Sequence, residues 1–286
     1  MELKRLGRTD MLVPEIGVGT WQYSGGADLL RKAVELGATL IDTAEYYRNE
    51  EVVGEAIRGI RERVFVATKV NHWRYRHVIA SAEASLRKLG TDRIDLYQLH
   101  WPNGAVPIEE TMAAMEALVD QGKVRYLGVS NFSVGELEKA QAALRRQRIV
   151  SNQVRYSLVE RTIEPRLLPY CQQHQVTVLA YSPLGHAFQR VLRADPSDAL
   201  GTVARAVGKT RAQVALNWCI AKAGVVALPK TELEAHLAEN CAASGWTLSN
   251  EHMQLLDRSI RYRRRSRPEA ALRRLVRNTL QRIQGA

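Results

Sequence analysis

Four residues whose side chains can transfer or steer a proton lie at or just beyond the ends of three successive predicted strands. They are Asp42, Tyr47, Lys69 and His100. In a barrel of parallel strands, the carboxyl ends of the strands meet at one face, and the chemistry of such enzymes takes place there. The spacing therefore predicts that these side chains form one cluster for proton transfer.

A phenol is a poor acid at neutral pH, because its ordinary pKa is about 10. An ammonium group beside it favours the phenolate, so we expect Lys69 to lower the pKa of Tyr47 and Asp42 to keep Lys69 charged. Tyr47 would then protonate an oxygen on which negative charge develops, and His100 would donate a second hydrogen bond to it. Taken singly, each residue has a structural explanation, such as an end cap for Asp42. Their shared phase on three neighbouring strands favours catalysis.

Short apolar segments alternate with amphipathic ones along most of the chain. The eight predicted strands lie near residues 16–20, 38–42, 64–69, 94–100, 124–130, 149–154, 176–181 and 225–228. The clearest amphipathic helices are predicted at 28–36, 78–89, 108–119 and 134–144. Buried parallel strands have this nearly continuous apolar composition, and eight strand–helix units fit this length. The sequence therefore predicts an α/β protein with a (β/α)₈ TIM barrel.

Other segments depart from this repeat. Residues 2–13 predict a small hairpin, turning at Gly7 and Arg8, that covers one end of the barrel. Pro183–Leu200 is predicted to be a long connection with few apolar residues, and loops of that length are usually functional. Two additional helices are predicted at 232–241 and 250–260. We expect the barrel to occupy residues 1–260.

Two rival classes fit the sequence less well. Doubly wound nucleotide-binding folds carry Gly-x-Gly-x-x-Gly after the first strand, whereas the segment here begins with Gly17 and Gly19 but ends in Gln22. A metal-dependent barrel hydrolase using Asp42 and His100 is disfavoured, because Lys69 would put a cation where the metal should lie. We therefore expect no metal.

The composition is that of a globular protein. The chain has 286 residues, of which 45% are hydrophobic and 25% are charged. The charged amino terminus lacks the apolar core of a signal peptide, and no apolar run reaches the roughly 18 residues of a membrane span, so we expect a cytoplasmic protein. Cys171, Cys219 and Cys241 are far apart and suggest neither a disulfide framework nor a zinc site.

The net charge of +11 lies mainly in a carboxyl-terminal tail. Residues 261–286 carry nine Arg and one Glu, a net charge of +8, which leaves +3 for the rest, so we expect no nucleic-acid partner. Five apolar tail residues fall on one helical face: Leu272, Leu275, Val276, Leu280 and Ile283. This pattern favours an amphipathic helix packed on the barrel; contact with an anionic membrane or a partner is the alternative.

Seven motifs in register make the chain resemble the aldo-keto reductases over all but about its last 25 residues. They are Asp42-Thr-Ala-x-x-Tyr47-x-Asn49-Glu50, Ala67-Thr-Lys69-Val70, Leu99-His100-Trp101-Pro102, Gly128-Val-Ser130-Asn131-Phe132, Asn152-Gln153, Ala180-Tyr181-Ser-Pro-Leu-Gly185 and Pro229-Lys230-Thr231. That family reduces aldehydes and ketones with NADPH in a (β/α)₈ barrel without a metal. The resemblance implies that Asp42, Tyr47, Lys69 and His100 are its catalytic tetrad.

The same resemblance implies where the cofactor binds. Ser130, Asn131 and Gln153 would hydrogen-bond the nicotinamide carboxamide, and Tyr181 would stack on the ring. Ser182 and Leu184 would lie along the pyrophosphate, and the segment Pro183–Leu200 would cover it. The remaining implied cofactor contacts are Thr20, Trp21, Lys230, Thr231, His236, Glu239 and Asn240.

One departure from the family pattern affects cofactor choice. Lys230 and Thr231 match positions that bind the 2′-phosphate of NADPH, but His236 stands where many members have Arg. An imidazole is only partly charged near neutral pH and lacks the bidentate geometry of a guanidinium. We therefore expect NADPH to be preferred and NADH to be tolerated.

Trp21, Tyr46, Trp73 and Trp101 are expected to line the substrate pocket. Trp21 and Trp101 match aromatic pocket positions of the family, Trp73 is a looser match, and Tyr46 follows from its adjacency to Tyr47. The pocket should admit apolar or aromatic small-molecule carbonyls. We expect the enzyme to be a monomer. The resemblance also leaves open a cofactor-sensing regulatory subunit that docks a partner through its basic tail.

Overall fold

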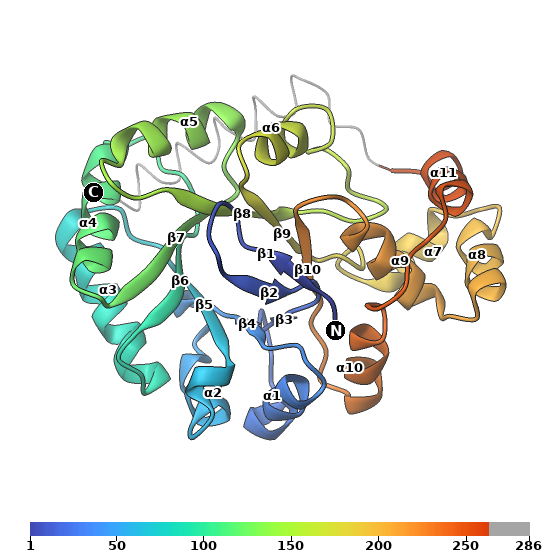
Figure 1. Ribbon diagram of the computed structural model, residues 1–286, viewed down its shortest axis with the longest axis horizontal. Coiled ribbons are helices and arrows are strands. Elements are labelled where there is room, and N and C mark those ends of the chain that lie inside the picture. The colour runs from blue at the N-terminus through green and yellow to red at the C-terminus, as the bar shows by residue number, and fades with distance from the viewer. Residues whose placement is uncertain (263–286) are drawn as a thin grey trace.

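The computed structural model describes residues 1–262, which form a barrel of eight parallel strands surrounded by helices (Figure 1). Each strand is hydrogen-bonded to the next in chain order. The strands are β3 (Val18–Gly19), β4 (Leu40–Asp42), β5 (Phe65–Val70), β6 (Ile94–Leu99), β7 (Val124–Ser130), β8 (Ile149–Arg155), β9 (Thr177–Tyr181) and β10 (Val225–Leu228). All eight predicted strands are present, and the predicted fold class is confirmed.

Backbone hydrogen bonds between the first and last strands close the barrel. The Gly17 N–H donates to the carbonyl oxygen of Ala227 at 2.9 Å, and the Ala227 N–H donates to that of Glu15 at 2.9 Å. A side chain at Gly17 would not fit, because its Cβ would lie 2.8 Å from the Leu40 carbonyl oxygen. The glycine lets the seam close tightly.

The helices bury one face against the sheet. They are α1 (Gly26–Glu35), α2 (Glu50–Ile57), α3 (Tyr75–Leu89), α4 (Ile108–Asp120), α5 (Val134–Ala143), α6 (Leu167–Gln173), α7 (Phe188–Arg193), α8 (Ala199–Val207), α9 (Arg211–Ile220), α10 (Glu234–Cys241) and α11 (Asn250–Ser259). In α3, for example, Val78, Ala82, Leu86 and Leu89 are buried at helical spacing. The four clearest predicted helices and the two additional ones are confirmed.

The amino-terminal hairpin closes the end of the barrel opposite the predicted active site. Strands β1 (Leu3–Arg5) and β2 (Leu12–Pro14) lie across the barrel centre in Figure 1. Gly7 in the turn has a φ of +56°, and its N–H donates to Thr177 Oγ1 at 2.7 Å. The barrel end is thereby sealed from solvent, as predicted.

The segment Pro183–Leu200 is more regular than predicted. It contains helix α7, and α8 begins within it at Ala199. Phe188, Val191 and Leu192 share one helical face; Val191 is fully buried, and the other two pack against the core. These three apolar residues give α7 a buried face, which explains why a helix forms within the expected connection.

The Arg-rich tail predicted at 261–286 lies, beyond Tyr262, outside the described residues. Within residues 1–262, no helix is long and apolar enough to cross a bilayer. Cys171, Cys219 and Cys241 are free and buried, in agreement with the prediction that they form no disulfide framework.

Candidate active site

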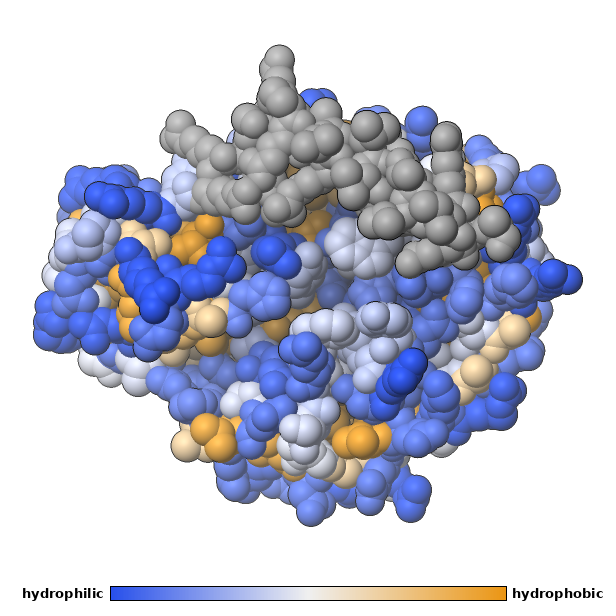
Figure 2. All heavy atoms as spheres, turned by 180° about the vertical axis from the view of Figure 1, so that it is seen from behind, coloured by the Kyte–Doolittle hydropathy of each residue, from blue (hydrophilic) through white to orange (hydrophobic). Residues whose placement is uncertain are grey.

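All four predicted proton-transfer residues meet at the carboxyl ends of the strands, on the face opposite the hairpin. That face is hollowed near its centre (Figure 2). Asp42 is the last residue of β4, Lys69 lies in β5, and His100 directly follows β6. Tyr47 ends the short 3₁₀ helix Glu45–Tyr47, which follows β4 and brings the phenol back over the barrel.

Lys69 and Asp42 form a buried ion pair. The Lys69 Nζ lies 2.7 Å from Asp42 Oδ2 and donates a second hydrogen bond of 2.7 Å to the Thr43 carbonyl oxygen. Burial by itself would lower the pKa of Lys69, but the negative charge of Asp42 outweighs it, so that the pKa is raised. The group is therefore an ammonium at neutral pH.

Two amide side chains hold the other oxygen of Asp42. Oδ1 accepts hydrogen bonds from Gln153 Nε2 at 2.7 Å and from Gln98 Nε2 at 3.3 Å. The sequence analysis missed Gln98. Its position two residues before His100 in a buried strand was the available signal, because alternate residues of a strand point to the same face.

The Lys69 ammonium lies beside the Tyr47 phenol, with its Nζ 4.9 Å from the centre of the ring. The prediction that the Tyr47 pKa would be lowered is nevertheless wrong for this structure. Burial raises the pKa more than the Lys69 charge lowers it, and the nearby Asp42 also raises it. Tyr47 is therefore a neutral phenol that carries its proton at neutral pH, with a cation beside it.

His100 is held as a neutral imidazole. Burial, reinforced by the Lys69 charge, lowers the pKa of His100 to about 3. Its Nδ1 is buried and has no hydrogen-bond partner among residues 1–262. The His100 ring lies edge-on to Tyr47, with ring centres 5.7 Å apart, so both residues border the same space.

The four predicted pocket aromatics are linked to Tyr47 and His100 by ring contacts and one hydrogen bond. Trp21 meets the Tyr47 ring edge-on, with centres 5.0 Å apart, and stacks on Tyr46 at 6.3 Å. Trp101 stacks on His100 at 6.3 Å, and Trp73 Nε1 donates to the Trp101 carbonyl oxygen at 2.9 Å. Because Trp21, Tyr46 and Trp101 are 43%, 62% and 37% exposed, they form an aromatic mouth open to solvent.

Three of the predicted nicotinamide contacts form one hydrogen-bonded group with Gln153. Asn131 Nδ2 donates to Ser130 Oγ at 2.9 Å, and Ser130 Oγ donates to the Gln153 carbonyl oxygen at 2.9 Å. The Tyr181 hydroxyl donates to Asn131 Oδ1 at 3.1 Å. The guanidinium of Arg155, a residue that sequence reasoning did not select, lies 5.6 Å from the Tyr181 ring centre. These side chains are gathered at the ends of three neighbouring strands.

The remaining predicted cofactor residues follow the rim. Thr20 is fully buried and its hydroxyl donates to the Asp42 carbonyl oxygen at 3.1 Å, so this hydroxyl already has a partner within the protein. Ser182 and Leu184 follow β9 and are half-buried. Lys230 and Thr231 follow β10, whereas His236, Glu239 and Asn240 lie in α10; Lys230 and His236 are exposed and Asn240 is buried.

An open groove of about 570 Å³ continues from this rim. It runs beside Glu239 and is lined by Phe188 and Leu192 of α7 and by Ala212 of α9. The α7 side chains were missed in the sequence because their segment was expected to be a loop.

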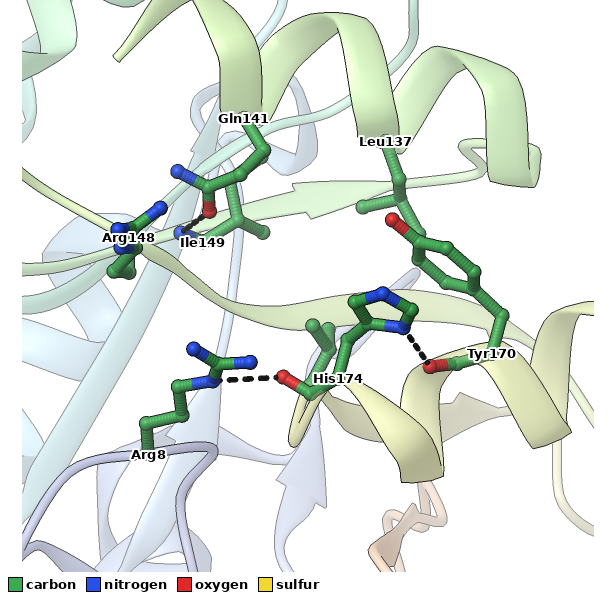
Figure 3. Close-up of a pocket in the computed structure, with 8 residues that line it drawn as sticks. Arg8, Leu137, Gln141, Arg148, Ile149, Tyr170 and His174 are labelled. Atoms are coloured by element: carbon green, nitrogen blue, oxygen red, sulfur yellow. Dashed lines mark hydrogen bonds between the residues drawn. The ribbon is translucent and has the colours of Figure 1, made fainter. Parts of the chain in front are cut away.

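A smaller cavity of about 110 Å³ lies near the hairpin, away from the tetrad (Figure 3). Arg8 of the hairpin turn and Arg148, just before β8, border it, and the Arg8 Nε donates to the His174 carbonyl oxygen at 3.0 Å. It belongs to the amino-terminal end of the barrel and not to the candidate active site.

Sequence and structure comparisons agree with this geometry. The model of the Aldo/keto reductase family matches residues 15–261. The methylglyoxal reductase YeaE of Escherichia coli strain K12 is 42% identical over 262 residues, which cover 87% of this chain and 92% of the relative. The crystal structure of an aldo-keto reductase from Klebsiella pneumoniae in complex with NADPH has a TM-score of 0.82 and 41% identity over 92% of this chain and 96% of that one. The thermostable aldo-keto reductase Tm1743 has a TM-score of 0.84 and 41% identity over 90% of this chain and 99% of that one. This chain belongs to the aldo/keto reductase family.

Proposed function

We propose that this protein reduces aldehydes or ketones to alcohols with NADPH and that Tyr47 supplies the proton. The observation that carries the proposal is the Tyr47 phenol beside the buried Lys69 ammonium, whose Nζ lies 4.9 Å from the centre of the phenol ring. An acid of this kind is useful where negative charge develops on an oxygen, as it does when a carbonyl carbon accepts a hydride.

The residues around the tetrad fit a nicotinamide dinucleotide. The cluster of Ser130, Asn131 and Gln153 offers short polar groups for a carboxamide, and the half-buried Tyr181 ring offers a flat face beside them. The Arg155 Nε is buried and has no hydrogen-bond partner within the described part of the chain, which suits a nearby anionic group. The groove beside Glu239 is open enough for the adenosine half. When bound, the cofactor supplies the hydride.

The proton moves from the Tyr47 hydroxyl to the substrate oxygen. Loss of this proton leaves a phenolate, and the adjacent Lys69 ammonium stabilises that negative charge at the moment it forms. Asp42 keeps the ammonium in place, and Gln98 and Gln153 fix the orientation of Asp42. The neutral His100 ring positions the substrate oxygen by a hydrogen bond without competing as an acid.

The aromatic mouth favours small carbonyls with a flat or apolar substituent. Trp21, Tyr46 and Trp101 present exposed rings next to the tetrad, and such rings offer apolar faces for contact with a substrate. The relative named methylglyoxal reductase suggests that α-oxo aldehydes belong to the accepted class. We propose small aldehydes, including such compounds, as preferred substrates.

Two measurements on the purified full-length chain test this function. Quenching of tryptophan fluorescence by NADPH and NADH gives the dissociation constants, and loss of absorbance of the reduced cofactor follows turnover with methylglyoxal, 4-nitrobenzaldehyde and simple keto esters. Saturable binding with carbonyl-dependent oxidation of the cofactor supports the proposal. Absence of binding to either dinucleotide contradicts it.

A further inference from the structure

One carboxylate occupies the predicted phosphate site and connects its two sides. Glu232 Oε1 lies 2.8 Å from the Lys230 Nζ and accepts hydrogen bonds from the Ser24 N–H at 3.1 Å and the Ser24 hydroxyl at 2.9 Å. Ser24 precedes α1, and Lys230 follows β10. A single oxygen thus bridges two loops that are 208 residues apart in the sequence.

The three hydrogen bonds fix both the charge and the direction of this carboxylate. The hydrogen bonds from Lys230 and then from Ser24 lower the pKa of Glu232, so the group is ionised at neutral pH. Ser24 holds the carboxylate from the other side, which keeps it on Lys230. In this structure, the ammonium that would receive a 2′-phosphate is already paired with an anion.

We propose that Glu232 is a specificity-determining residue that opposes the 2′-phosphate of NADPH and favours the ribose hydroxyl of NADH. This inference rests on the proposed function. A phosphate monoester must take Lys230 away from Glu232 and then lie beside a negative charge, whereas a 2′-hydroxyl can donate a hydrogen bond to the same carboxylate. Acidic residues recognise the ribose of NAD in this way in other dinucleotide-binding folds.

The neighbouring charges do not offset this effect. His236 is exposed in the first turn of α10, and an imidazole lacks the bidentate geometry with which a guanidinium binds phosphate. Lys32 is paired with Glu35 at 3.4 Å and with Glu234 at 4.0 Å, so this cation already has carboxylate partners. Lys230 and Glu232 therefore act in opposition and together set the cofactor ratio.

The test compares Glu232→Gln with Glu234→Gln in the full-length chain. Both substitutions remove one exposed negative charge, at positions two residues apart in the sequence, but of the two only Glu232 contacts Lys230. Dissociation constants for NADPH, NADH, 2′-AMP and 5′-AMP are measured by fluorescence and calorimetry. We expect Glu232→Gln to tighten NADPH and 2′-AMP binding on the order of tenfold, as suits removal of one like charge a few ångströms away in a solvated site. NADH binding should stay equal or weaken, and Glu234→Gln should leave the NADPH-to-NADH ratio within twofold.

Two further measurements, the dependence on ionic strength and the variant Lys230→Met, test the same role of Glu232. The effect of Glu232→Gln should shrink as ionic strength rises, because the groups are exposed. Lys230→Met should move the ratio in the opposite direction, toward NADH. If the wild type binds both dinucleotides and Glu232→Gln leaves their ratio unchanged, the role of Glu232 is wrong while the proposed function stands. If the wild type binds neither, both proposals fail.

Discussion

The Lys69 Nζ lies 2.7 Å from Asp42 Oδ2, and both side chains are buried inside the barrel. Such a pair contributes little net stability compared with an apolar replacement, because removing two charges from water is costly. Its presence at the carboxyl end of the strands is better explained by the phenol it serves. In the proposed mechanism, the cation is held next to the oxygen of Tyr47 that would become negative.

Asp42→Asn should therefore damage both stability and turnover. The variant leaves Lys69 charged and buried without its counterion, and breaking one side of a buried pair costs about 3–5 kcal/mol. Urea unfolding measures the loss, with the exposed Asp92→Asn as a matched control. An unfolding free energy equal to that of the wild type would contradict the prediction that Lys69 needs the Asp42 charge as its counterion.

His100 should remain uncharged across the working pH range. Its pKa in the folded protein is about 3, against about 6.5 when unfolded. Between these values the unfolded chain binds the extra proton, so this residue makes stability fall as pH decreases below about 6.5, by at most about 1.4 kcal/mol per pH unit. The His100 ring proton signal in NMR should not shift between pH 8 and 5.

The pH dependence of the unfolding free energy gives a second test of the neutral imidazole. His100→Gln should lose less unfolding free energy than the wild type between pH 7 and 5, and His77→Gln should behave like the wild type. A His100 signal that titrates near pH 6.5 would contradict the neutral-imidazole assignment.

Gly128 has no room for a side chain in β7. A Cβ there would collide with the Ser151 hydroxyl and lie 2.9 Å from Gln98 Cγ, so Gly128→Ala should destabilise the barrel by about 1–3 kcal/mol and displace the amide that holds Asp42. Adding Ser151→Ala removes the nearest obstacle and should recover part of the loss.

Gly135→Ala is the control: nothing lies within 4 Å of its Cβ in α5, so this change should stabilise the protein by about 0.5–1 kcal/mol. Equal effects of the two glycine substitutions would exclude the packing argument.

Most of the architecture could be predicted because buried parallel strands and amphipathic helices have distinct apolar patterns. The phase of Asp42, Lys69 and His100 on three neighbouring strands located the proton-transfer cluster before any distance was known. Helix α7 was not predicted, because three apolar residues among six are too few to define helical periodicity in the sequence.

The sequence could not predict how deeply each titratable side chain is buried or which distant loops are in contact. The direction of the Tyr47 pKa shift depends on whether burial or the Lys69 charge dominates, and only the folded structure compares them. Gln98 supports Asp42 from 56 residues away. Glu232 acquires its orientation from Ser24, which no local motif indicates.

The rate of hydride transfer in Tyr47→Phe, measured in a single turnover with bound NADPH, tests the central claim most directly. The substitution removes one oxygen and leaves the ring that contacts Trp21 and His100. We predict a rate lower by about 10²–10⁴-fold, as expected for loss of a general acid, with the NADPH dissociation constant within twofold of the wild type. The adjacent, exposed Tyr46→Phe should retain the wild-type rate. A wild-type rate in Tyr47→Phe would contradict the assignment of the Tyr47 hydroxyl as the proton donor.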